Sequence, residues 1–327
     1  MNDAMNEGTD ISSKQEPLAA AVAAAAPDFQ AAVQPSYIRT VFLGPDGLRA
    51  GWGLAFYVAM FYLLHSVLGR WAASAEIAFK LSPSGLRSMM LEEFVVLLSA
   101  VLPAFVLARV EGRPWSAYGL PRQNLFGKLF WAGTAWGFAS ITLLLAAMYG
   151  MRLFDFGHLA LHGLRILKFA AFWMVFFLLV GFFEEFLLRG YSQFTLTRAI
   201  GFWPAAVILS GAFGLIHIQN AGEQWPGLLA AAVIGLFFCL TLRRTGSLCF
   251  AVGFHMAWDW GETFFYSVPD SGTLFPGHLL KSSFHGPQWL TGGIVGPEGS
   301  VLCFVVVGVT WAAFAKIYPP STSPVSH

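Results

Sequence analysis

Eight long apolar stretches dominate this chain and restrict the folds that it can adopt. Each is long enough to supply the ~20 residues that cross ~30 Å of hydrocarbon. A membrane β-barrel is excluded, because its strands have only ~10 residues of alternating polarity. We therefore predict an all-α fold, a polytopic membrane helix bundle with about eight transmembrane helices, at about residues 51–69, 92–110, 127–149, 166–188, 202–219, 226–242, 247–266 and 300–317.

Charged residues are scarce, which supports the same conclusion. They make up 11% of the 327 residues, against 56% apolar residues, whereas a soluble domain carries roughly 25% charged residues. This composition excludes a soluble enzyme. The balance of 19 Lys and Arg against 18 Asp and Glu provides no basic surface for nucleic acid, so we expect membrane lipid, and no nucleic acid, among the partners.

The sequence divides into a membrane domain and two tails. Residues 1–36 contain scattered acidic residues around an alanine run and are predicted to be a disordered N-terminal tail; residues 37–318 form the eight-helix domain and 319–327 a C-terminal tail. Lys and Arg are more numerous in the loops on the side of both termini, which predicts that both termini are cytoplasmic. We expect a multi-pass protein of a bacterial cytoplasmic membrane. Residues 267–299, rich in Gly and Pro, are long enough to form a lid.

Ionisable groups inside apolar stretches are the candidates for function. Each costs about 2.5 to 3.5 kcal/mol on insertion scales and is by default functional or paired. One further acid, Glu262, is expected to be solvated at the end of its helix. The candidates lie on three of the predicted helices: Glu184, Glu185 and Arg189 at the end of the fourth, His217 at the end of the fifth, and His255 and Asp259 in the seventh.

Helical spacing assigns different positions to these groups. Glu185 and Arg189 are four residues apart and can form an ion pair on one face, whereas Glu184 points ~100° away and is available as a general base. His255 and Asp259 also share a face, as do Phe213 and His217. A hairpin that turns near residue 200 brings Glu184 and His217 to the same depth, ~23 Å from the turn.

The ordered motifs resemble those of a known family. Glu184-Glu185-x-x-x-Arg189, Phe213-x-x-x-His217 and His255-x-x-x-Asp259 are similar to the motifs of the CPBP intramembrane proteases, also called the Abi or CAAX protease family. That family includes the CAAX prenyl endopeptidases and the lysostaphin-resistance-like proteins. The resemblance covers residues 165–265. It implies an endopeptidase that hydrolyses a peptide bond near the membrane surface, in a membrane-associated peptide or protein.

The resemblance also implies a role for each motif residue. Glu184 would activate a water molecule with help from His217, while His255 and the residue four positions later would stabilise the oxyanion. Glu185, Arg189 and Phe213 would support the site. In the prenyl endopeptidases the later position is Asn, and here it is Asp259. Because an ionised Asp cannot donate a hydrogen bond, Asp259 is either protonated or orients His255.

No cofactor is favoured for this chemistry. Members of the family are often described as metalloproteases, and a zinc ion held by Glu184, His217 and His255 is the alternative. The HExxH motif of many zinc proteases is absent, and a glutamate-activated water needs no metal.

Two other functions stay open. A non-catalytic membrane scaffold or immunity protein of the same fold would keep the motifs without activity. A transporter is less favoured, because it predicts an inverted repeat or broken helices at corresponding places, and the sequence has neither.

Overall fold

The computed structural model describes residues 37–44, 47–82, 85–121 and 123–320. The chain divides into two compact units, residues 1–47 and 48–327. The described part of the first unit consists of α2 (Tyr37–Phe42) and β1 (Leu43–Gly44), and β2 (Gly47–Leu48) crosses the boundary. The predicted N-terminal tail, and all but the first two residues of the C-terminal tail, lie outside the described residues.

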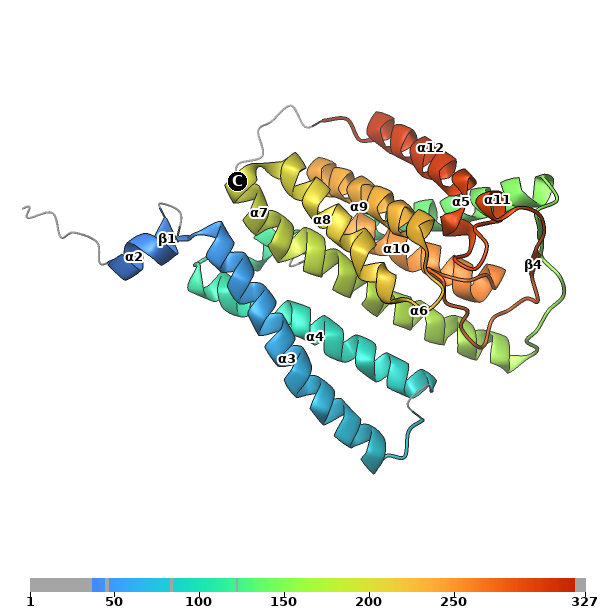
Figure 1. The fold of residues 1–327 in the computed structure, drawn as a ribbon, viewed down its shortest axis with the longest axis horizontal. Coiled ribbons are helices and arrows are strands. Elements are labelled where there is room, and N and C mark those ends of the chain that lie inside the picture. Colours follow the sequence, from blue (N-terminus) through green and yellow to red (C-terminus); the bar gives the residue numbers. More distant parts are fainter. Residues whose placement is uncertain (1–36, 45–46, 83–84, 122, 321–327) are drawn as a thin grey trace, which may run out of the picture. The chain divides into compact units, whose positions relative to one another are not determined.

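The second unit is helical and confirms a bundle of apolar helices (Figure 1). Within the described ranges, six helical segments are long and apolar enough to cross a membrane. The fourth combines three consecutive helices and the fifth combines two. The six are α3 (Ala50–Ala78), α4 (Leu86–Val110), α5 (Lys128–Gly150), α6 (Leu164–Glu185) with η3 (Phe186–Ser192) and α7 (Gln193–Ile200), α8 (Phe202–Ile216) with η4 (His217–Gln219), and α9 (Trp225–Thr245).

The predicted count of about eight spans is not confirmed. The last predicted stretch is α12 (Val301–Ile317), an apolar helix of 17 residues that is shorter than the six. The seventh is α10 (Cys249–Trp260), which continues into the π-helical turn η5 (Gly261–Tyr266). Every residue of α10 except the last is buried. Because protein rather than lipid surrounds this helix, it can carry polar side chains that a lipid-facing helix could not.

Short elements connect the helices. Strand β3 precedes α6 and pairs antiparallel with β4, which holds the middle of the 267–299 segment against the chain that leads into α6. The remaining elements are η2 (Trp115–Tyr118), β3 (Phe154–Asp155), β4 (Ser283–Phe284), α11 (Gln288–Thr291) and η6 (Pro297–Gly299).

Glycines bring α5 and α10 into backbone contact. Gly133 and Gly137 of α5 lie so close to the carbonyl groups of Phe250 and Phe254 that a Cβ atom at either position would overlap them, and Gly253 of α10 meets α5 in the same way. Small residues four positions apart are the usual means by which membrane helices approach closely. Helix α6 packs against α10 as well, so α10 lies between two long helices.

A break in the helix after α6 directs the chain around the candidate site. The π-helical turn η3 contains Gly190, whose φ of −82° and ψ of −112° are not helical. The ring of Phe186 occupies the place where a side chain of Gly190 would lie. Single π-helical turns inside longer helices occur often at functional sites. Here η3 begins directly after Glu184 and Glu185 and contains Arg189, and η5 begins two residues after Asp259.

Candidate active site

The predicted catalytic side chains line one cavity. Its volume is about 230 Å³, and its walls come from α4, α6, α8 with η4, α9, α10 and the 267–299 segment. Glu184, His217, His255 and Asp259 all line it, together with Phe213. The structure therefore brings together groups from three separate sequence motifs, as the sequence predicts, while their catalytic roles stay predictions.

Glu185 lies behind the cavity and joins two motifs. Its side chain is fully buried, and its Oε1 atom lies 3.2 Å from Nη1 of Arg189, so the ion pair predicted from their spacing is present. The same oxygen accepts a hydrogen bond from the Nδ1–H of His255 at 3.1 Å. Because a carboxylate on one imidazole nitrogen fixes the orientation and tautomer of the ring, Glu185 directs the other nitrogen of His255 toward the cavity.

Arg189 is buried between aromatic rings. Its guanidinium carbon lies 4.3 Å from the centre of the Phe213 ring and 5.9 Å from the centre of the Phe238 ring. Gly235 of α9 leaves the space for this group, since a Cβ atom at that position would overlap Nη2 of Arg189. A cation on the face of a desolvated ring gains about 2 kcal/mol, which helps to offset the cost of burying the charge.

Two carboxylates face the cavity-side nitrogen of His255. Nε2 lies 3.5 Å from Oε2 of Glu184 and 3.3 Å from Oδ2 of Asp259. Spacing along α10 correctly places Asp259 on the same face as His255. The carboxylate of Asp259 is close to Nε2 of the His255 ring, whereas Glu185 contacts Nδ1. His255 and Asp259 are buried, while the side chain of Glu184 is 21% exposed.

His217 is held by its own helix. Its Nδ1–H donates to the carbonyl oxygen of Phe213 at 2.8 Å, and the two rings are in edge-to-face contact with centres 4.7 Å apart. This hydrogen bond leaves Nε2 of His217 as an acceptor. The ring is half-buried and lines the cavity. Phe213 contacts His217, while its supporting role stays a prediction.

One further acid of the cavity, on another helix, is not predicted from the sequence motifs. Glu93 of α4 lines the same cavity, and its Oε1 is buried without a hydrogen-bond partner among the described residues. A signal was present, since Glu92 and Glu93 stand inside the second predicted apolar stretch. Helical spacing alone does not show which acid points inward: Glu92 is exposed and Glu93 is not.

The 267–299 segment forms one wall of the cavity. Asp270, Ser271 and Glu298 are among its lining residues, and the Nδ2–H of Asn220 donates to the carbonyl oxygen of Ser271 at 3.1 Å. These residues stand in a loop without periodicity, so the sequence carries no pattern that would reveal them. The expectation that Glu262 is solvated is wrong: it is 0% exposed, because this segment folds over the end of η5.

Two carboxyl groups outside the helices have raised pKa values. Burial raises the pKa of Asp270 well above its usual range, and the neighbouring carboxylates of Asp259 and Glu298 act in the same direction. Burial likewise raises the pKa of Glu223, although a hydrogen bond from the backbone of Gln224 partly opposes this shift. Asp259, Asp270 and Glu298 all line the cavity, so acidic groups are close together there.

The residues of the zinc alternative do not gather as a metal site would require. Nitrogen and oxygen ligands lie about 2.0 to 2.2 Å from zinc, so two ligand atoms on one ion are at most about 4.4 Å apart. In the described part of the chain, one set of three acidic, His or Cys ligand atoms lies within 4.8 Å of one another, and its members are Glu262, Asp270 and Glu298. Glu184, His217 and His255 form no such set.

Comparison with known proteins agrees with the motifs. Residues 166–261 match the family described as type II CAAX prenyl endopeptidase Rce1-like. No curated protein and no solved structure matches the chain. The matched range contains every residue of the three motifs, from Glu184 to Asp259, and it confirms the family resemblance predicted from them. Residues 166–261 are thus a domain of the Rce1-like type II CAAX prenyl endopeptidase family, the CPBP family.

Proposed function

We propose that the chain is an intramembrane endopeptidase that hydrolyses a peptide bond of a membrane-associated peptide or protein, near the membrane surface. The observation that carries this proposal is the meeting of Glu184, His217, His255 and Asp259 at one cavity inside the family domain. Family membership itself implies a peptidase. The apolar helices around the site would hold the enzyme, and its substrate, in the lipid bilayer.

Glu184 is the general base in this proposal. A water molecule between its carboxylate and Nε2 of His217 would lose a proton to Glu184 as its oxygen attacks the carbonyl carbon of the substrate. His217 accepts the second hydrogen bond of that water, because its Nδ1–H is already donated to Phe213. Glu184 would then transfer the proton to the departing amine, which breaks the C–N bond and regenerates the carboxylate.

His255 and Asp259 stabilise the oxyanion together. Since Nδ1–H of His255 is donated to Glu185, this pair has a proton to offer in two cases only. Either the ring is doubly protonated and Nε2 carries the proton, or Asp259 is a neutral acid and its carboxyl group carries it. In both descriptions one proton lies between Nε2 and Oδ2 of Asp259, which are 3.3 Å apart. That proton can turn toward the oxyanion, and such a donor contributes roughly 2.7–4 kcal/mol in well-studied sites.

Glu185 and Arg189 are positioning residues in this scheme. They touch neither the water nor the substrate, and they keep the His255 ring in place from behind. No metal takes part in any step. Both termini would be cytoplasmic, as the distribution of Lys and Arg favours.

Glu184→Gln provides the direct test. In purified full-length protein reconstituted into lipid vesicles, the substitution keeps the shape of the side chain and removes the base, so turnover should fall by 10² or more. Glu92→Gln, an exposed acid of α4, is the matched control and should keep wild-type turnover. Substrates can be found by comparing protein termini in cells that express the wild type or Glu184→Gln. Retained turnover in Glu184→Gln would contradict the proposal.

A scaffold function predicts a different result. A non-catalytic protein of this fold would still complement a deletion strain when both Glu184 and His217 are replaced by Ala. An endopeptidase loses complementation with either substitution, provided that membrane levels of the protein are unchanged.

A further inference from the structure

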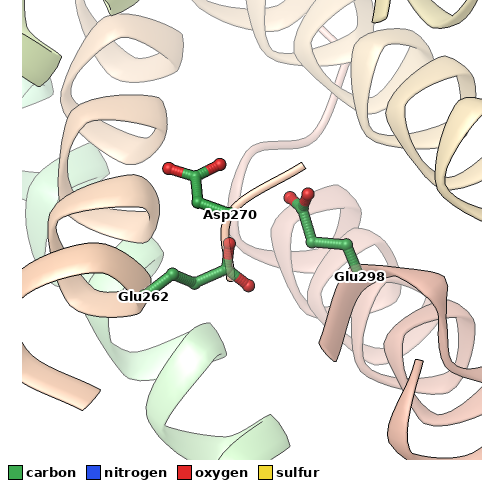
Figure 2. Close-up of side chains that lie close together, drawn as sticks. All are labelled: Glu262, Asp270 and Glu298. Carbon is green, nitrogen blue, oxygen red and sulfur yellow. The ribbon is translucent and has the colours of Figure 1, made fainter. Parts of the chain in front are cut away.

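Three acidic side chains gather near the proposed catalytic residues, and two of them, Asp270 and Glu298, line the cavity. They come from three different places in the chain: Glu262 from η5, Asp270 from the start of the 267–299 segment, and Glu298 from η6 (Figure 2). One carboxylate oxygen from each lies within 4.8 Å of the other two. None forms an ion pair with Lys or Arg in the described part of the chain.

Glu262 has no group to balance it. Its side chain is 0% exposed, and neither Oε1 nor Oε2 has a hydrogen-bond partner among the described residues. A buried carboxyl group without partners costs several kcal/mol, and the side chains that gather with it here are two further acids. The arrangement therefore lacks a positive charge at the point toward which the three side chains converge.

The other two carboxylates are oriented by hydrogen bonds. Oε1 of Glu298 accepts from the indole Nε1–H of Trp258 at 3.1 Å, and its Oε2 accepts from the Ser271 hydroxyl at 2.8 Å. Oδ2 of Asp270 accepts from the hydroxyl of Thr263 at 3.1 Å. Such outer contacts fix metal ligands in known sites, and they leave lone pairs on each carboxylate for a further ligand.

We propose that Glu262, Asp270 and Glu298 bind a hard divalent cation of the Ca²⁺ type. Oxygen-only ligands select Ca²⁺, Mg²⁺ or Mn²⁺ over softer metals. Ca²⁺ takes its oxygens at 2.3–2.6 Å, so two ligands of one ion can be about 4.8 Å apart, whereas Mg²⁺ at 2.0–2.1 Å would require them to be closer. The three oxygens lie within 4.8 Å of one another, which is compatible with Ca²⁺, and water would complete its coordination.

The cation joins the 267–299 segment to the end of α10. Asp270 and Glu298 stand near the two ends of this segment, and Glu262 follows the His255 and Asp259 motif within one turn of helix. Binding therefore fixes the wall of the cavity that this segment forms. This inference concerns a structural ion and does not depend on the proteolytic mechanism.

Direct cation binding to the purified, full-length protein tests the inference. Protein in detergent is treated with a chelator, exchanged into chelator-free buffer and titrated with Ca²⁺, with Mg²⁺ in parallel, by calorimetry. We expect one saturable site per chain and a higher Tm with Ca²⁺. Absence of saturable binding of either ion to the wild type overturns the inference, whatever the variants do.

Matched variants locate the ion. Glu262→Gln and Asp270→Asn keep side-chain shape and should weaken Ca²⁺ binding by 10-fold or more. Asp155→Asn alters an exposed acid, paired with His285 at 2.9 Å, and should bind as the wild type does. Unchanged affinity in both Glu262→Gln and Asp270→Asn overturns the inference. If one of these two fails to fold, the other decides.

Terbium luminescence gives a second, independent location. Tb³⁺ replaces Ca²⁺ at oxygen sites, and the indole of Trp258, which contacts Glu298, should transfer excitation to it. Trp258→Phe should therefore lower the emission per bound ion well below the wild-type value. If Trp258→Phe and Glu262→Gln both show the same Tb³⁺ emission per bound ion as the wild type, Tb³⁺ binds elsewhere and the assignment is contradicted.

Discussion

One oxygen of Glu185 receives hydrogen bonds from two motifs: Arg189 lies 3.2 Å and the Nδ1 atom of His255 lies 3.1 Å from the same Oε1. The acid of the first motif therefore sets the orientation of the histidine of the third, and Arg189 balances its charge. Glu184, the neighbouring acid, is left to face the cavity. Two consecutive glutamates thus have different surroundings because their side chains leave the helix in different directions.

Glu185→Gln should lower kcat and leave KM nearly unchanged. The amide keeps the volume but loses the charge that holds Arg189 and His255, and loss of such a supporting contact costs 10–100-fold in comparable sites. Steady-state kinetics in vesicles measure this. Glu111 provides the control. It does not line the cavity, and its Oε2 atom forms an ion pair with Nε of Arg113 at 3.1 Å. Glu111→Gln should keep kcat. An equal fall in both variants would indicate a general loss of stability instead.

Asp259→Asn should retain activity within about 10-fold, while Asp259→Ala should lose 10² or more. The amide of Asn donates a hydrogen bond to the oxyanion without needing the proton that Asp259 shares with His255. The ratio of kcat/KM for the two variants measures the effect. If Asn is as inactive as Ala, the charge of Asp259 matters more than hydrogen-bond donation, and the proposed oxyanion contact is wrong.

Gly235→Ala should disturb the site from the neighbouring helix. The added methyl group would overlap Nη2 of Arg189, and this buried guanidinium has little room to move between Phe213 and Phe238. Overpacking of this kind typically costs 1–3 kcal/mol. We expect a lower Tm and a lower kcat.

Gly308→Ala is the matched control for this substitution. Gly308 of α12 has nothing within 4 Å of the added Cβ, and Ala favours the helix by up to about 1 kcal/mol. Its Tm should equal or exceed that of the wild type. A Gly235→Ala protein with unchanged Tm and kcat would show that Arg189 shifts without consequence.

Glu223 should make stability depend on pH. Because burial raises the pKa of Glu223, the folded protein binds this proton more tightly than the unfolded chain. The free energy of unfolding therefore falls as pH rises from about 4.5 through the raised value. Glu223→Gln cannot ionise and should lose less Tm between pH 5 and pH 8, by a difference on the order of 2 °C. The exposed Glu92→Gln should follow the wild type, and parallel curves for all three proteins would contradict this prediction.

Much of the architecture is readable from the sequence because lipid requires apolar, uninterrupted helices. The six long helices coincide with six predicted apolar stretches, and the spacing of Glu185 and Arg189 correctly predicts their ion pair. α10 is different. Protein covers it on nearly all sides, so its hydropathy carries little information about lipid contact, and the predicted count of eight spans is not confirmed.

The parts of the site that the sequence did not reveal lie outside helical patterns. Asp270 and Glu298 meet Glu262 only because the 267–299 segment folds back over η5, a contact that no spacing rule predicts. The sequence predicts, wrongly, that Glu262 is solvated, because the segment that covers it cannot be predicted from spacing. Long-range contacts of this kind depend on packing between distant segments, whereas the three motifs depend on spacing within single helices.

The backbone contact between α5 and α10 has a consequence for synthesis. Phe254 follows Gly137 by 117 residues, and a ribosome that adds ~5–20 residues per second needs roughly 6–23 s to make them. During that interval the glycine face of α5 lacks the neighbour that covers it in the folded protein. The membrane insertion machinery must therefore either shield α5 until α10 emerges or release the two helices into the bilayer as a pair.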